Sequence, residues 1–158
     1  MELLKKAKEN HLHVCMETCG FARTELVENT AAFVDIYLFD YKETDPEKHK
    51  QCTGEDNYLI LKNLKRIDEM GKSIILRCPI IPGYNDIETH FDGIARLANS
   101  LRNILQIEIE PYHNLGEGKY MRLGRKYTLS GINQPDEERI SLWMKQLQKS
   151  TNIKVKKA

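Results

Sequence analysis

The chain has 158 residues, of which 41% are hydrophobic, and its 24 basic side chains nearly balance its 23 acidic ones. The formal net charge of +1 argues against a nucleic-acid-binding protein, which usually carries a basic excess, and no apolar run is long enough to cross a membrane. A closed eight-fold β/α barrel needs about 250 residues, so this chain holds four or five βα units, which we expect to form a single domain over residues 1–158. No signal peptide stands at its start, and we expect a cytoplasmic protein.

Helix-like and strand-like patterns alternate along the chain. Helical spacing of apolar residues begins at Leu3 with no capping residue before it, so we expect the chain to start inside a longer protein. Strands are expected over residues 11–15, 34–40, 73–81 and 105–110, with a fifth short one over 153–155. Helices are expected over residues 23–33, from Asn57 to Gly71, after Asp86 and after Pro135. This alternation predicts an α/β fold with about four parallel βα units and right-handed crossovers.

Charged residues in two of these strands constrain their surroundings. Residues 73–81 are nearly continuously apolar, which is typical of a strand covered on both faces. Arg77 interrupts this run, and it must pair with a carboxylate or face a cavity, because an unpaired buried charge costs several kcal/mol. Glu108 and Glu110 share one face of their strand by alternation. The irregular stretch 113–135 is too long for an ordinary connection and is expected to be functional.

Polar residues follow each of the four longer expected strands, at residues 15–21, 40–42, 82–86 and 111–116. Because ligands bind at the carboxyl ends of parallel strands, this convergence predicts a site there. The candidate residues are Glu17, Thr18, Asp40, Lys42, Arg77 and His113. Several also have a purely structural interpretation: an ion pair between Asp40 and Lys42, a helix cap for Glu17 and Thr18, and an ordinary loop histidine for His113.

The four cysteines, at positions 15, 19, 52 and 78, are expected to be reduced, because nothing marks a secreted, disulfide-stapled fold. Cys15 and Cys19 are spaced as two ligands of a metal or cluster site. A third thiolate in step would fall at position 22, which is Ala22. We therefore expect no metal site in this chain and interpret all four as small core residues.

At the strand ends the sequence resembles the glycyl-radical-enzyme activating enzymes of the pyruvate formate-lyase activating type, within the radical SAM (S-adenosylmethionine) superfamily. The run His-Val-Cys-Met-Glu-Thr-Cys-Gly-Phe at residues 13–21 resembles their strand and turn. Three further stretches agree in order and spacing, at residues 39–42, 80–86 and 111–116, the last followed by Lys119-Tyr120 and Leu123-Gly124. The resemblance covers essentially the whole chain.

The resemblance implies an incomplete TIM-like barrel in which a [4Fe-4S] cluster cleaves SAM reductively, and the resulting radical takes a hydrogen from a glycine of a partner glycyl radical enzyme. By position it places Glu17 and Thr18 near the amino acid moiety of SAM and a monovalent cation. It places Asp40 and Lys42 along the SAM site, and Arg77 and His113 towards the nucleoside and the entering glycine loop.

The sequence departs from the family at the cluster motif. The family's C-x3-C-x2-C motif, and the Gly-Gly-Glu-Pro stretch that follows it, do not occur in this sequence. The chain therefore resembles only the last four of six βα units, or about two-thirds of the partial barrel. We expect a truncated activating enzyme that is inactive alone, binds neither the cluster nor SAM fully, and has no catalytic residue that can be assigned.

Two alternatives remain open. The chain is also compatible with a non-catalytic barrel fragment that binds a partner chain supplying the missing strands. A motif-independent alternative is a metal-independent enzyme with Lys42 as an imine-forming lysine and His113 as base. In the fragment interpretation, the edge beside the missing units, expected at residues 11–15, is unpaired and favours self-association.

Overall fold

The computed structural model describes all 158 residues. The helices and strands occur in the order α1 (Glu2–Glu9), β1 (Cys15–Thr18), α2 (Thr24–Ala31), β2 (Ile36–Asp40), α3 (Pro46–Thr53), α4 (Tyr58–Glu69), β3 (Ser73–Ile80), α5 (Glu88–Ser100), β4 (Ile104–Pro111), η1 (Asn114–Gly116), α6 (Glu117–Arg122), α7 (Glu137–Lys149) and β5 (Val155–Lys157). No helix has the length and apolar character needed to cross a bilayer.

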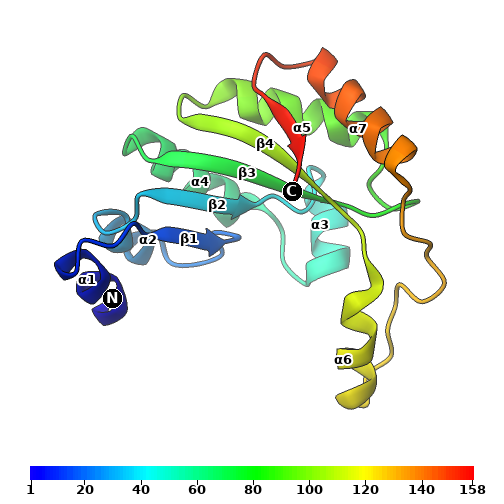
Figure 1. Ribbon diagram of the computed structural model, residues 1–158, viewed down its shortest axis with the longest axis horizontal. Coiled ribbons are helices and arrows are strands. Elements are labelled where there is room, and N and C mark those ends of the chain that lie inside the picture. Colours follow the sequence, from blue (N-terminus) through cyan, green and yellow to red (C-terminus); the bar gives the residue numbers. More distant parts are fainter.

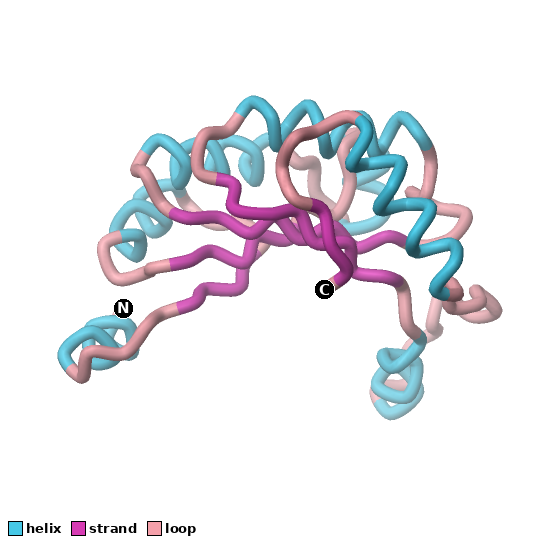
Figure 2. Tube along the Cα trace, turned by 45° about the horizontal axis from the view of Figure 1, so that its top comes forward, coloured by secondary structure: helices cyan, strands magenta, loops and turns pink.

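The strands form one parallel sheet in the order β1-β2-β3-β4-β5 (Figure 1). The α/β fold and its parallel sheet are confirmed. The sheet has five strands, the four longer ones that were expected and the short fifth one, β5, which forms at residues 155–157, two residues later than expected, and pairs with β4. Most helices lie over one face of the sheet and leave the other face uncovered, whereas α1 and α6 stand off at its two ends (Figure 1 and Figure 2).

The two faces of β3 differ, which contradicts the expectation that both are covered. Its residues alternate between half-buried and buried along the whole strand. Leu76, Cys78 and Ile80 are fully buried against the helices, in the single core cluster. Arg77 and Pro79 point to the uncovered face, where they are only half-buried. The apolar run therefore indicated a strand correctly but overstated how much of it is covered.

The first strand lies farther along the chain than expected. Residues 11–15 were predicted to form it, but His11 has a left-handed φ of 56° in the turn after α1. The Val14 amide then donates to a carboxylate oxygen of Asp35 at 2.7 Å. Pairing with β2 begins only at Cys15, opposite Ile36. The segment interpreted as a turn after the strand is thus the strand itself.

Two expected helix caps have other roles. The helices after Asn57 and Asp86 form, but neither side chain caps them. Asp86 accepts hydrogen bonds from the Gly83 amide at 2.6 Å and from the Arg139 guanidinium at 2.5 Å. Helix α3 was not predicted, although its start has clear signals: the Asp45 side chain accepts from two amides of the first turn, and a proline follows it.

The stretch 113–135 is partly ordered rather than irregular throughout. It forms η1 and α6, which project away from the sheet beyond the end of β4 (Figure 1). At its base the Tyr112 and Tyr127 hydroxyl oxygens lie 2.8 Å apart. This hydrogen bond, followed by partial burial, raises the pKa of Tyr127 to about 12. The tyrosine pair therefore ties the returning chain to the end of β4.

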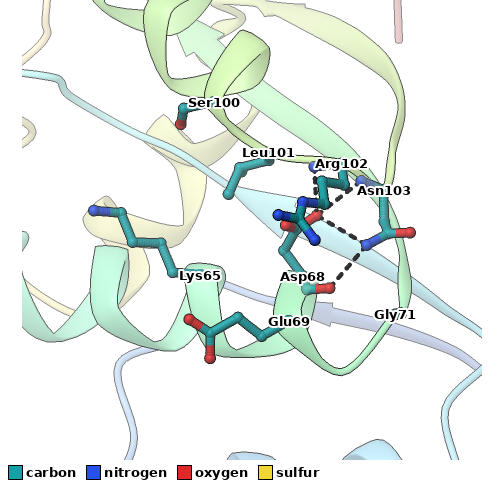
Figure 3. Close-up of a pocket in the computed structure, with 8 residues that line it drawn as sticks. All are labelled: Lys65, Asp68, Glu69, Gly71, Ser100, Leu101, Arg102 and Asn103. Carbon is teal, nitrogen blue, oxygen red and sulfur yellow. Dashed lines mark hydrogen bonds between the residues drawn. The ribbon is translucent and has the colours of Figure 1, made fainter.

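The amino edge of the sheet is held by Asp68, at the end of α4. One of its carboxylate oxygens accepts from the backbone amides of Arg102 at 2.9 Å and Asn103 at 2.8 Å (Figure 3). A polar hollow of about 600 Å³ lies beside this contact. This hollow is lined by the last turns of α4 and α5 and by the turns that precede β3 and β4. It therefore lies at the opposite edge of the sheet from the strand ends where the site was predicted.

Candidate functional site

A row of alternating charges crosses the uncovered face of the sheet. The strand register places Asp40 of β2 opposite Arg77 of β3, and Arg77 opposite Glu108 of β4. Glu108 in turn stands opposite Lys156 of β5, whose ammonium lies 3.2 Å from the Glu108 carboxylate. Four strands thus contribute one charged residue each, in the sign order minus, plus, minus, plus.

Arg77 is the centre of this row. Its guanidinium lies 3.0 Å from the Glu17 carboxylate, binds the Glu110 carboxylate directly, and stands 3.9 Å from Glu108 and 4.0 Å from Asp40. Its side chain is 18% exposed. Partial burial acts to lower the pKa of Arg77, but the charges of Glu110 and then Glu17 outweigh it and hold that pKa above the usual arginine value. The expectation that Arg77 pairs with carboxylates is confirmed, as is the shared face of Glu108 and Glu110.

Asp40 and Lys42 form the ion pair that the structural interpretation predicted. The Lys42 ammonium lies 3.1 Å from one carboxylate oxygen of Asp40. The other oxygen of Asp40 is buried and has no hydrogen-bond partner in the protein. Buried polar atoms in native proteins nearly all have a partner. This oxygen, 4.0 Å from the Arg77 guanidinium, is therefore suited to accept a hydrogen bond from a ligand at the strand ends. The ion pair and a ligand-binding role are therefore compatible.

Two adjoining hollows open at the carboxyl edge of the sheet. One, of about 500 Å³, contains Arg77, Glu110 and His113 in its lining. The other, of about 550 Å³, contains Lys42. Pro79 and Ile81 line both hollows, so the structure brings Arg77, His113 and Lys42 around one short segment of β3 and the turn after it.

Thr18 is the candidate that the structure does not bring to this face. It alternates with Glu17 along β1 and lines a small cavity of about 140 Å³ on the helix-covered side, together with residues of α2. Its hydroxyl accepts from the Gly20 amide at 3.0 Å. Three further residues belong to the charged row and its surroundings. No sequence motif points to Lys156, whereas the alternation of Glu108 and Glu110 along their strand is a signal that could have identified them as site residues.

The residues of this chain do not fit an iron–sulfur cluster. No three side chains among His, Cys, Asp and Glu are arranged to hold a metal ion. The interpretation of all four cysteines as core residues is wrong for three of them, because Cys15 and Cys52 are exposed and Cys19 is half-buried. The Cys15 sulfur lies 3.8 Å from Nδ1 of His13. Cys78 is enclosed in the core, and burial raises the pKa of its thiol. Three thiolates on one loop, as the cluster requires, are not present.

The loop that carries Lys42 is held by a buried acid. The Glu43 carboxylate accepts from the backbone amides of Thr44 at 2.7 Å and Asp45 at 3.1 Å, and its oxygen lies 3.1 Å from Nδ1 of the buried His90. Burial acts to raise the pKa of Glu43, but the hydrogen bond from His90 and those from the two amides outweigh it and lower that pKa to about 2.

The Glu43→Gln variant tests this carboxylate. Because the folded-state pKa of Glu43 lies below its usual value of 4.5, ionisation stabilises the fold above about pH 4.5, and the stabilisation is lost as the pH falls towards 2. We expect the variant to lose about 2 kcal/mol of unfolding free energy at pH 7, and the difference from wild type to vanish near pH 2. Urea unfolding across this range measures it, with exposed Glu55→Gln as control; a difference independent of pH contradicts the assignment.

The Arg77→Met variant tests the centre of the charged row. It leaves four carboxylates facing one another without their shared cation, so we expect a loss of about 2–4 kcal/mol of unfolding free energy at pH 7. Arg66 is the matched control, since it also bridges two carboxylates but its side chain is 44% exposed. Arg66→Met is expected to cost less than about 1 kcal/mol. Urea unfolding measures both losses. Equal losses would show that Arg77 stabilises the fold no more than an exposed arginine that bridges two carboxylates.

Comparisons with known sequences agree on one group of proteins. The chain is 34% identical over 156 residues to the trans-4-hydroxy-L-proline dehydratase activating enzyme of Clostridioides difficile. The matched region covers 98% of this chain and 51% of that protein. It is 33% identical over 144 residues to the pyruvate formate-lyase-activating enzyme of Streptococcus mutans, covering 87% of this chain and 55% of that protein. The chain thus spans about half the length of the curated relatives it matches. No family model matches it.

Solved structures give the same result for the fold. A domain of a pyruvate-formate lyase-activating enzyme from Bacteroides vulgatus superposes with a TM-score of 0.81 at 25% identity, covering 99% of this chain and 88% of that one. A radical SAM methyltransferase from Sphaerobacter thermophilus matches in fold alone, with a TM-score of 0.65 at 14% identity over 94% of this chain and 41% of that one. The sheet and its helices are therefore those of a partial, TIM-like radical SAM barrel. By sequence and by fold, the chain is related to the glycyl-radical-enzyme activating enzymes of the radical SAM superfamily.

Proposed function

We propose that residues 1–158 form one domain, the C-terminal part of the partial barrel of a cytoplasmic glycyl-radical-enzyme activating enzyme, and that they supply one wall of its SAM site. The observation that carries the proposal is the convergence of Glu17, Asp40, Lys42, Arg77 and His113 on one edge of the sheet, in a chain related to activating enzymes. Rigid strand ends hold these groups in place, which is what binding a charged cofactor requires.

The proposed roles follow from the charges of SAM, which carries an ammonium, a carboxylate and a sulfonium. The unpartnered Asp40 oxygen accepts a hydrogen bond from the ligand, and Lys42 attracts its carboxylate, while Arg77 lies towards the nucleoside. Glu17 adds a second carboxylate near the amino acid moiety, where its side chain is 62% exposed. His113 faces the nucleoside and the partner's glycine loop from the rim of the hollow. Thr18 supports this wall from behind through its hydrogen bond to Gly20.

The radical step lies outside what these residues do alone. Reductive cleavage of SAM needs a cluster for which this chain offers no ligand set, so its own part is to bind and orient. The relatives' names give the kind of partner: each activates another enzyme, such as a dehydratase or a formate-lyase. We propose a glycyl radical enzyme as the partner here, and that the 158 residues alone do not activate it.

The cluster and the cofactor site can be tested together. After anaerobic incubation with iron and sulfide, we expect the 158-residue chain to show no stoichiometric cluster absorbance and no SAM cleavage, because the ligand cysteines are missing. A chimera that joins it to the remaining, cluster-bearing part of the Streptococcus mutans activating enzyme is expected to cleave SAM under reducing conditions. Formation of 5′-deoxyadenosine, measured by chromatography, reports cleavage.

Variants of the chimera test whether these residues contact SAM or only hold the fold together. Asp40→Asn and Lys42→Ala are expected to lower cleavage at least about tenfold, since each removes a charge-assisted contact of roughly 1.5–3 kcal/mol. Arg66→Met, far from the strand ends, is the control and should leave cleavage unchanged. A cluster on the unmodified 158 residues, or full activity in both variants, would overturn the proposal.

A second candidate function is favoured by the free edge of β1. This strand pairs only with β2, so the backbone groups along its other edge have no strand partner. We propose as the alternative a non-catalytic barrel fragment that binds a partner chain through this edge, or associates with itself. The unpaired edge is at Cys15–Thr18 rather than at residues 11–15.

Light scattering tests the free edge. We expect the 158-residue chain to form dimers or larger species as its concentration rises. Cys15→Pro is expected to reduce this association, because the Val14 carbonyl faces β2, so the next amide, that of Cys15, points to the free edge, and proline cannot donate there. Ile107→Pro in β4 serves as the contrast and should unfold the chain, because Ile107 is paired with both β3 and β5 and its amide donates to the Lys154 carbonyl at 2.9 Å. A monomer at all concentrations would rule out self-association.

A further inference from the structure

Four buried polar side chains surround the loop after β2, and the cofactor contacts proposed above use none of them. They are Glu43, Asn57, Asn85 and His90, which are 7%, 4%, 5% and 1% exposed. Burying polar groups costs free energy unless they are hydrogen-bonded, so such a cluster in so small a chain needs a structural reason. The four come from the loop itself, from the start of α4, from the turn after β3 and from α5.

The two asparagines bind three consecutive carbonyls of the loop. The Asn85 side-chain amide donates to the Lys42 carbonyl at 3.2 Å and to the Pro79 carbonyl at 2.9 Å. Its oxygen accepts from the Ile81 amide at 2.7 Å, so Asn85 joins the end of β3 to the loop. The Asn57 side-chain amide donates to the carbonyls of the next two residues, at 3.2 Å and 3.3 Å.

Glu43 and His90 fix the same loop from its other side. The Glu43 carboxylate turns inward and binds the two following amides, and Nδ1 of His90 meets that carboxylate. Helix α5 approaches closely here: a Cβ at Gly93 would lie 2.6 Å from the side chain of Thr44. Backbone carbonyls, backbone amides and packing are thus all fixed within three residues of Lys42.

We propose that Asn57, Asn85, Glu43 and His90 are positioning residues, which hold the backbone of residues 42–44 so that the Lys42 ammonium stays against Asp40. The ammonium has a long, flexible stem and is 40% exposed, and its placement 3.1 Å from Asp40 depends on where the loop starts it. That the Lys42 ammonium binds a cofactor rests on the proposed function. That the four residues hold the ammonium beside Asp40 does not.

The chain contains a matched control for the asparagines. Asn63 of α4 is fully buried, and its side-chain amide donates to the carbonyls of Gly20 at 2.8 Å and Ala22 at 2.7 Å. It therefore makes the same bridge between two loop carbonyls, but in the loop after β1. A role that is only structural predicts the same behaviour for all three asparagines.

The experiment compares Asn57→Ala, Asn85→Ala and Asn63→Ala in the 158-residue chain. Lys42 acetylation by limiting acetic anhydride is measured by mass spectrometry relative to exposed Lys145, and thermal unfolding is recorded in parallel. All three variants are expected to unfold at lower temperature. Only the first two are expected to raise Lys42 acetylation, by about threefold, towards the level of the Asp40→Asn variant, in which the ion pair is removed directly.

Unchanged Lys42 acetylation in both loop variants, or an equal rise in Asn63→Ala, overturns the proposal. If the alanine variants do not fold, Asn57→Ser and Asn85→Ser replace them, because serine fills part of the space but cannot reach both carbonyls. The result does not depend on cofactor chemistry. A chimera that fails to cleave SAM contradicts the proposed function and leaves the acetylation result standing, and the reverse also holds.

Discussion

The structure depends on the register that aligns Asp40, Arg77 and Glu108 across the three central strands. A parallel sheet covered by helices on one face needs apolar side chains at every second position, and β3 supplies them. A shift of one residue would turn Arg77 into the helix-covered core, where an unpaired charge costs several kcal/mol. The same register that buries the core therefore also assembles the charged row.

The ion pairs on the uncovered face are of two kinds, those between different strands and one within a single strand end and its loop. Arg77 joins side chains from the first four strands, β1 to β4, whereas the Asp40–Lys42 pair is local to the end of β2. The first kind follows from strand register and the second from the path of a loop. A site built from both needs the loop to be as rigid as the sheet, and the buried amides and carboxylate around residues 42–44 provide that rigidity.

How far the sequence predicted this arrangement differs from residue to residue. The need of Arg77 for carboxylates followed from its apolar neighbours alone, and the strands around residues 36–40, 73–80 and 104–111 followed from their composition. The prediction placed the first strand too early, because two features set where the sheet begins. One is the turn at His11, and the other is the Asp35 side chain, which accepts a hydrogen bond from the Val14 amide 21 residues earlier in the chain. Asn57 and Asp86 looked like caps because a local pattern cannot show that a side chain has a distant partner. Thr18 fell on the other face once the strand shifted.

The position of Ala158 has a practical consequence. The β5 strand carries the chain along the edge of the sheet to its carboxyl end, where the Ala158 amide donates to the Ile109 carbonyl at 3.0 Å and the residue lines the hollow that holds Arg77 and His113. An affinity tag fused to Ala158 would begin at the lining of that hollow. A tag that starts there is close enough to obstruct a ligand, so fusions and surface immobilisation are better attached through helix α1, none of whose residues is buried.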